Sequence, residues 1–176
     1  MSKLFHWSTA VLILVMVTLG WLAVTYPLSP TKLALFNWHK SLGLLVLAWM
    51  TLRLAWRLAH PAPAPPADTS PAEQRAARIA HGCLYILMFA MPISGWVINS
   101  AADFPLKWFG LFSIPPLVAP DQGVQDTAEA VHLVLFWTLI GLVALHAAAA
   151  VHHHRRRRNN VLTRMLPFTR SERWPR

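Results

Sequence analysis

The sequence predicts an all-α integral membrane protein that folds as one four-helix bundle. Its 176 residues are 55% hydrophobic and only 13% charged, against about 25% charged residues in soluble domains. Four apolar runs reach the roughly 20 residues that cross a hydrocarbon core as a helix, and none has a charged residue in its middle third. The single cysteine, Cys83, excludes a disulfide scaffold and a metal cluster held by four thiolates.

The four predicted helices span residues 4–26, 38–58, 79–98 and 128–151. A chain in lipid must satisfy its backbone hydrogen bonds internally, and a helix does so. The first run is longer than the apolar region of about 7–15 residues in a secretory signal peptide, and it lacks an Ala-x-Ala cleavage site. We therefore expect it to remain as the first helix, which ends before Pro27.

Three segments between and after these runs have distinctive compositions. Residues 61–71 are rich in proline and alanine, which predicts an extended linker. Residues 101–127 contain four prolines and several aromatic residues, and we expect them to cap one face of the membrane. Residues 152–176 form a basic tail. The chain shows no internal repeat, so residues 1–176 are predicted to form a single domain.

The distribution of lysine and arginine predicts the orientation of the helices. If the helices alternate in direction, one side of the membrane carries 13 of these residues and the other carries only Lys32, Lys40 and Lys107. Basic residues concentrate on the cytoplasmic side, so both termini are expected there. The run from Arg155 to Arg158 follows a predicted span, where such residues contact anionic lipid headgroups. The formal net charge of +9 thus indicates topology and lipid contact rather than nucleic-acid binding.

Four histidines lie near the ends of the predicted helices, and histidine inside a membrane is costly and usually functional. Antiparallel neighbours put His6 and His146 near the cytoplasmic face and His39 and His132 near the opposite face. His132 and His146 are 14 residues apart, which is about 40° short of four full turns and about 21 Å along the axis. Both therefore point to one face of the fourth helix.

Paired imidazoles from different helices can belong to several kinds of functional site. A structural zinc site takes four ligands, often thiolates, and a proton relay uses carboxylates, but neither level offers them. Two axial imidazoles with apolar walls suit a b-type haem, whereas a c-type haem would need Cys-x-x-Cys-His, which the chain lacks. Small residues also serve ordinary helix packing, but here they would leave room for a macrocycle at Gly43, Gly95, Gly141 and Ala147 to Ala150.

Five features follow one another in a fixed order along the chain: Phe5-His6-Trp7, Trp-His-Lys-Ser-Leu-Gly at 38–43, Pro-Ile-Ser-Gly at 92–95, the His132–His146 spacing, and Asn-Val-Leu-Thr-Arg-Met at 160–165. Through this ordered set, nearly the whole chain resembles the bacterial cytochrome b561 family of diheme, quinone-linked membrane proteins.

The resemblance implies a four-helix membrane bundle that encloses two non-covalent b haems, each with two axial histidines. Carried over by position, His6 and His146 would hold the haem on the cytoplasmic side, and His39 and His132 the haem on the periplasmic side. This assignment agrees with the depths expected from the helix directions. The family also implies ubiquinone as a redox partner.

Further contacts are expected from charged and polar residues near the four ligands. Arg53 and Lys40 could pair with haem propionates, although both could instead extend to the lipid headgroups. His153 could hydrogen-bond a quinone carbonyl, although it could also belong to a solvated tail. His81 is expected to be an interface residue, because the other four histidines already make two pairs.

The expected function is transfer of single electrons across or within the bacterial inner membrane, to or from ubiquinone. One alternative is a superoxide:ubiquinone oxidoreductase, since some family members oxidise superoxide, although the outer side is slightly acidic apart from a patch around Lys107. A second is a haem-b membrane anchor of a larger oxidoreductase. A third is a cofactor-free membrane protein, such as a transporter or a metal-handling bundle, that uses the same histidines. Whether the chain acts as an enzyme stays open at this point, as does the identity of a periplasmic electron donor.

Overall fold

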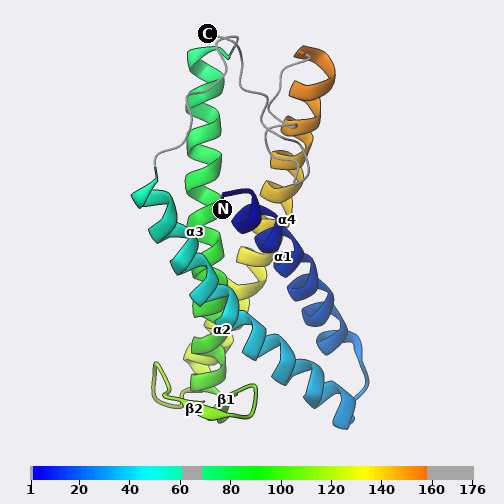
Figure 1. The fold of residues 1–176 in the computed structure, drawn as a ribbon. Helices are drawn as coiled ribbons and strands as arrows, with labels where there is room; N and C mark the ends of the chain where they lie inside the picture. Colours follow the sequence, from blue (N-terminus) through cyan, green and yellow to red (C-terminus); the bar gives the residue numbers. More distant parts are fainter. Residues whose placement is uncertain (1, 61–68, 158–176) are drawn as a thin grey trace.

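The described part of the protein consists of four long helices and one small hairpin (Figure 1). The computed structural model describes residues 2–60 and 69–157, except for the side chains of residues 153, 156 and 157. In chain order the elements are α1 (Ser2–Thr25), α2 (Pro30–Ala59), α3 (Pro71–Ala101), β1 (Leu106–Trp108), β2 (Phe112–Ile114) and α4 (Gln122–Arg157). The predicted all-α fold class is confirmed. Most of the predicted 61–71 linker and of the basic tail lies outside the described residues.

The α2 and α3 helices begin before their apolar runs because polar capping residues, and not the membrane boundary, determine where they start. Ser29 caps α2 by accepting a hydrogen bond from the backbone N–H of Lys32 at 3.2 Å, and Pro30 follows in the first turn. Ser70 and Glu73 form a reciprocal capping box at the start of α3. Such caps satisfy backbone N–H groups that have no partner within the helix. Hydropathy alone places these two starts eight residues too late.

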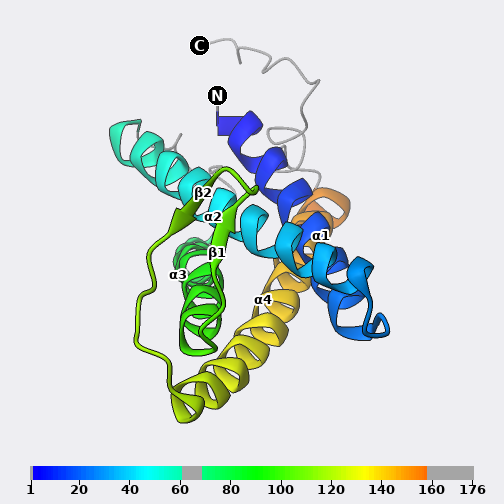
Figure 2. The ribbon, with the colours of Figure 1, turned by 90° about the horizontal axis from the view of Figure 1, so that it is seen from below.

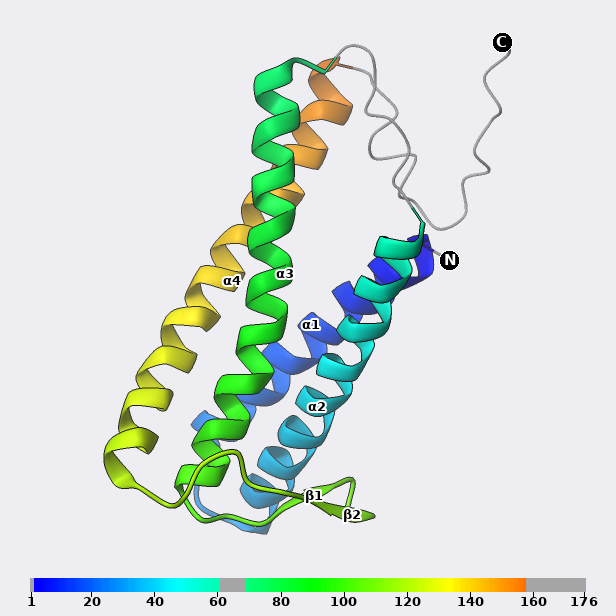
Figure 3. The ribbon, with the colours of Figure 1, turned by 90° about the vertical axis from the view of Figure 1, so that its left-hand side faces the viewer.

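The helices pack in two pairs, α1 with α2 and α3 with α4, and α2 joins the pairs through its contact with α3 (Figure 3). At the end opposite the hairpin, α3 and α4 extend beyond α1 and α2 (Figure 1). A small apolar core lies where the pairs meet, formed by Val46, Met50, Leu87, Met88 and Leu139.

Most apolar side chains point away from this core. All four helices are long and apolar enough to cross a membrane, and only 6 to 17% of the residues in their most apolar windows are buried within the protein. Leu14, Val24 and Leu145 are each more than 60% exposed. Apolar surface on this scale is stable only when another apolar phase covers it, and the hydrocarbon of a bilayer is such a phase.

A two-stranded hairpin covers the end of the bundle where α3 finishes (Figure 2). The strands are antiparallel, with Lys107 opposite Ser113, and Ser41 of α2 anchors them. The Ser41 hydroxyl accepts a hydrogen bond from the backbone N–H of Phe109 at 3.0 Å, and its carbonyl accepts one from the Trp108 indole at 3.1 Å. The cap expected over residues 101–127 is therefore partly a β-hairpin, and its three-residue strands are too short to leave a periodic sequence pattern.

Candidate functional site

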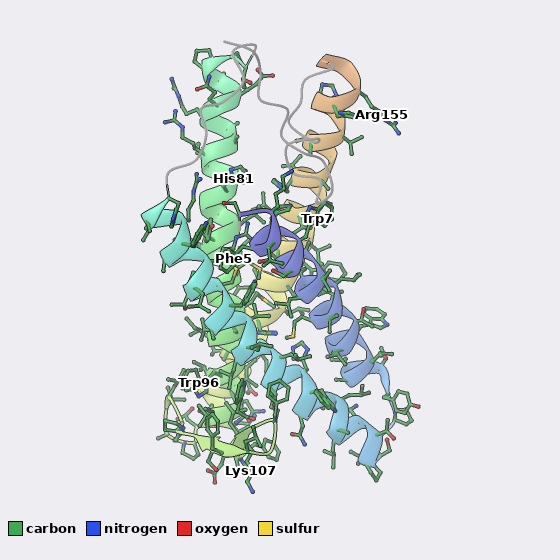
Figure 4. All side chains as sticks on the ribbon, in the orientation of Figure 1. Phe5, Trp7, His81, Trp96, Lys107 and Arg155 are labelled. Carbon is green, nitrogen blue, oxygen red and sulfur yellow. The ribbon has the colours of Figure 1, made fainter. Side chains whose placement is uncertain are left out.

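Histidines from three helices meet at the end of the bundle away from the hairpin, here called the basic end. The ring centroids of His6 on α1 and His146 on α4 are 6.2 Å apart. His81 on α3 lies edge-on to the same His146 ring, with centroids 5.3 Å apart. In Figure 4, His81 lies in the same half of the molecule as Phe5 and Trp7, while Trp96 and Lys107 mark the hairpin end.

Arg53 of α2 lies among these helices and is half-buried. Its guanidinium donates a hydrogen bond to the Phe5 carbonyl at 3.3 Å and lies 5.6 Å from the centre of the Tyr85 ring. One turn to either side on α2, Trp49 and Trp56 pack their rings near that of Phe5.

The indole N–H groups of Trp49 and Trp56 are buried and have no hydrogen-bond partner among the described residues. A buried donor without a partner costs roughly 1–3 kcal/mol. The α2 helix thus presents a cation and two indole groups with unused donors beside Phe5, the residue that precedes His6, and this combination suits an anionic group.

The second pair of histidines lies nearer the hairpin, and both rings pack on glycines. A Cβ added at Gly20 of α1 would lie 3.0 Å from Cε1 of His39, and one added at Gly95 of α3 would lie 3.5 Å from Cε1 of His132. His39 and His132 lie within electrostatic range of one another. Glycines on α1 and α3 therefore leave space for the imidazole rings of α2 and α4, respectively.

The ring nitrogens of this second pair differ in their surroundings. Nδ1 of His132 lies 2.8 Å from the hydroxyl oxygen of Ser94. Nδ1 of His39 is buried without a hydrogen-bond partner in the described part of the chain, and the Met16 carbonyl lies nearby.

Comparison with known proteins identifies the family. The family model described as "Prokaryotic cytochrome b561" matches residues 1–168. The chain belongs to the prokaryotic cytochrome b561 family. A protein of Escherichia coli K12 named "Cytochrome b561 homolog 2" is 36% identical, over 97% of this chain and 92% of the relative. "Cytochrome b561 homolog 1" of the same organism is 31% identical, over 92% of each chain. "Probable superoxide oxidase CybB" of Yersinia pestis is 30% identical, over 76% of this chain and 75% of the relative.

Membership of the cytochrome b561 family makes the chain a bacterial membrane protein that transfers electrons by means of b-type haem. The described residues fit such a group. With metal–nitrogen bonds of about 2 Å and ring centroids about 1 Å behind the nitrogens, imidazoles on opposite sides of one iron have centroids about 6 Å apart. The His6–His146 spacing of 6.2 Å matches this distance. Across residues 2–60 and 69–157, no three histidine, cysteine or acidic residues are arranged to hold a bare metal ion.

The other residues singled out in the sequence occupy varied positions. Gly95 contacts His132, whereas Gly43 faces the Met16 side chain, and a Cβ at Gly141 would meet no described atom within 4 Å. The ammonium of Lys40 lies over the Phe104 ring, 5.4 Å from its centre. His153 is in α4, but its side chain lies outside the described part.

Several site residues gave no usable signal in the sequence. Gly20 lies in a run of ordinary apolar residues, and its role depends on the crossing of α1 over His39. Trp49 and Trp56 resemble any tryptophan in a membrane helix until their indole groups are found buried and unpartnered. Ser94 belongs to the Pro-Ile-Ser-Gly motif, but the motif alone assigns it no partner.

Replacing Gly20 with alanine is expected to disturb the site although alanine favours helices by about 1 kcal/mol over glycine. The added Cβ would lie 3.0 Å from His39 Cε1, so the imidazole must move. We expect Gly20→Ala to lower the haem absorbance per mole of purified protein. Gly82→Ala is the control, because its Cβ would meet no described atom within 4 Å. Equal absorbance in the two variants would show that His39 does not depend on the gap at Gly20.

Proposed function

We propose that this cytochrome holds two b-type haems, one at each end of its bundle, and carries single electrons between the two faces of the inner membrane. His6 and His146 would be the axial ligands at the basic end, and His39 and His132 those at the hairpin end. The observation that carries the proposal is the facing pair of imidazoles from α1 and α4, 6.2 Å apart, together with a second pair packed on glycines near the other end.

The histidine ligands and the residues around them have separate roles. The four histidines would hold b-type haem, which would supply an iron that accepts and releases single electrons. The histidines fix its position and orientation. At the basic end, the Arg53 guanidinium and the unused indole N–H groups of Trp49 and Trp56 would bind its acidic substituents and exclude water. At the hairpin end, Lys40 would serve the same purpose by leaving its position over Phe104.

The charge distribution supports an orientation with the basic end in the cytoplasm. Basic residues outnumber acidic ones near that end, where Arg53, Arg57, Arg75, Arg78 and Arg155 lie. Cytoplasmic loops and tails carry such an excess. The hairpin end would then face the periplasm, and both termini would be cytoplasmic.

Ubiquinone is the proposed partner within the membrane. The outward surface of the four helices is apolar, so a lipid-soluble quinone can approach the bundle from the side without crossing water. His153, which follows His146 by two turns of α4, remains our candidate for a quinone contact.

A second candidate function is oxidation of superoxide at the periplasmic face with transfer of the electron to quinone. The observation that favours it is the 30% identity to a relative named "Probable superoxide oxidase CybB". The hairpin end carries Lys32, Lys40 and Lys107 against Asp103, Asp121, Asp126 and Glu129. A positive field attracts an anion, so any superoxide site would depend on a local patch near Lys107.

Substitution of single ligands tests the pairing of the histidines. In a redox titration followed by visible absorbance, His39→Ala and His132→Ala are each expected to abolish the same one of two transitions. His6→Ala and His146→Ala should both abolish the other. His81→Ala is the control and should keep both transitions, because His81 lies edge-on to His146 and has no assigned ligand role. Loss of different transitions within one proposed pair would overturn the ligand assignment.

Stopped-flow mixing of the oxidised protein with decylubiquinol, superoxide or buffer distinguishes the two functions. We expect decylubiquinol to reduce the haem under anaerobic conditions, which would place quinone among its redox partners. Reduction by superoxide that superoxide dismutase abolishes would favour the second function. If neither reagent reduces the haem faster than buffer does, both proposed redox partners are wrong.

A further inference from the structure

Ser94 of α3 joins two helices at the hairpin end through its hydroxyl group. The residue is only 8% exposed. Its Oγ lies 2.8 Å from Nδ1 of His132 on α4 and 2.9 Å from the backbone carbonyl oxygen of Met91, one turn earlier on α3. The same carbonyl also lies beside the His132 ring. The His132 ring therefore has both a hydroxyl and a carbonyl beside it.

The single proton of the hydroxyl determines which partner donates. A carbonyl oxygen can only accept, so the contact between Ser94 and Met91 requires Ser94 to donate its proton to Met91. The Ser94 oxygen is then left to accept from His132, whose Nδ1 must carry a proton. In a neutral imidazole the other nitrogen, Nε2, then holds the free lone pair.

We propose that Ser94 is a positioning residue that fixes His132 as the Nδ1–H tautomer, with Nε2 free to bind iron. The inference rests on the proposed ligand role of His132. A hydrogen bond donated by the far nitrogen of a metal-bound histidine orients the ring and makes it a better electron donor. Ser94 thereby stabilises the ferric state of the hairpin-end haem.

This arrangement also makes the two ligands of the hairpin-end haem unequal. Nδ1 of His39 is buried without a hydrogen-bond partner among the described residues, and the ring has only the Met16 carbonyl nearby, whereas Nδ1 of His132 lies 2.8 Å from the Ser94 hydroxyl. The effect of Ser94 is therefore specific to one ligand of one haem, and the basic-end haem serves as an internal reference.

The surroundings of Ser94 permit a matched pair of substitutions. Ser94 lines an open groove of about 510 Å³ between α3 and α4, together with Val97, Ala128 and Val131. The groove has room for one added methyl group. Threonine keeps the hydroxyl, and valine has the same shape without it, so the two variants differ in the hydrogen bond alone.

The test is a redox titration of the full-length protein carrying Ser94→Val or Ser94→Thr, with electron paramagnetic resonance of the oxidised protein. In Ser94→Val we expect the equilibrium constant for reduction of the hairpin-end haem to rise about threefold, or about 28 mV at 59 mV per tenfold for one electron. Its low-spin ferric signal should also shift. Ser94→Thr should keep the wild-type potential and signal, and neither variant should change the basic-end haem.

Each result separates this inference from the function on which it rests. If the wild-type protein has no haem that depends on His132, the proposed function fails and the role of Ser94 with it. If that haem is present and Ser94→Val matches the wild type in potential and signal, only the inference is overturned. Equal shifts in Ser94→Val and Ser94→Thr would also overturn it, because packing would then be the cause.

Ser94→Val or Ser94→Thr could also lose the hairpin-end haem altogether, and each such result has its own interpretation. If Ser94→Val loses the hairpin-end haem while Ser94→Thr retains it, the hydroxyl is required and the inference is supported. If both variants lose the hairpin-end haem, Ser94→Ala, which adds no volume, is tested instead. We expect it to raise the equilibrium constant for reduction of that haem as described for Ser94→Val. Ser100→Ala is the control on α3, because its buried hydroxyl bonds Trp96 and Leu117 and no histidine, and it should leave both potentials unchanged.

Discussion

An imidazole ring inside a membrane is costly unless the protein supplies partners for its nitrogens, because hydrocarbon supplies neither donors nor acceptors. This constraint accounts for the arrangement of the bundle. At the basic end, His146 faces His6 from α1 and contacts His81 from α3. At the hairpin end, one nitrogen of His132 is bound by Ser94, while Nδ1 of His39 is buried with no hydrogen-bond partner in the part of the chain that the structure describes. A metal held between the two rings of each pair would supply a partner to one nitrogen of each ring.

The apolar core separates the two histidine levels. Leu139 is seven residues from both His132 and His146 on α4, and Met88 is seven residues from both His81 and Gly95 on α3. At 1.5 Å per residue, each level lies about 10 Å from the core along its helix. The apolar core thus lies midway between the histidine levels, where close packing excludes water, and the outer surfaces of the helices are left to the lipid. A small apolar core is therefore enough to separate the two histidine levels.

The sequence predicts the elements that follow from hydropathy and residue type, and it misses those that depend on how helices cross. Apolar length identifies all four helices, and intramembrane histidines identify the residues that the structure brings together as His6 and His146. The early starts of α2 and α3 were missed because capping serines lie in polar segments. Gly20 and Ser94 acquire their roles only from the helices opposite them. The hairpin depends on a distant anchor, Ser41, and its strands are too short to be seen in the sequence.

The number of haems bound per chain tests the paired-imidazole arrangement most directly. Full-length protein purified from iron-replete cells should yield two b-type haems per chain in a pyridine haemochrome assay, and its oxidised spectrum should be that of low-spin iron with two nitrogen ligands. A correctly folded chain that binds one haem or none would contradict the account.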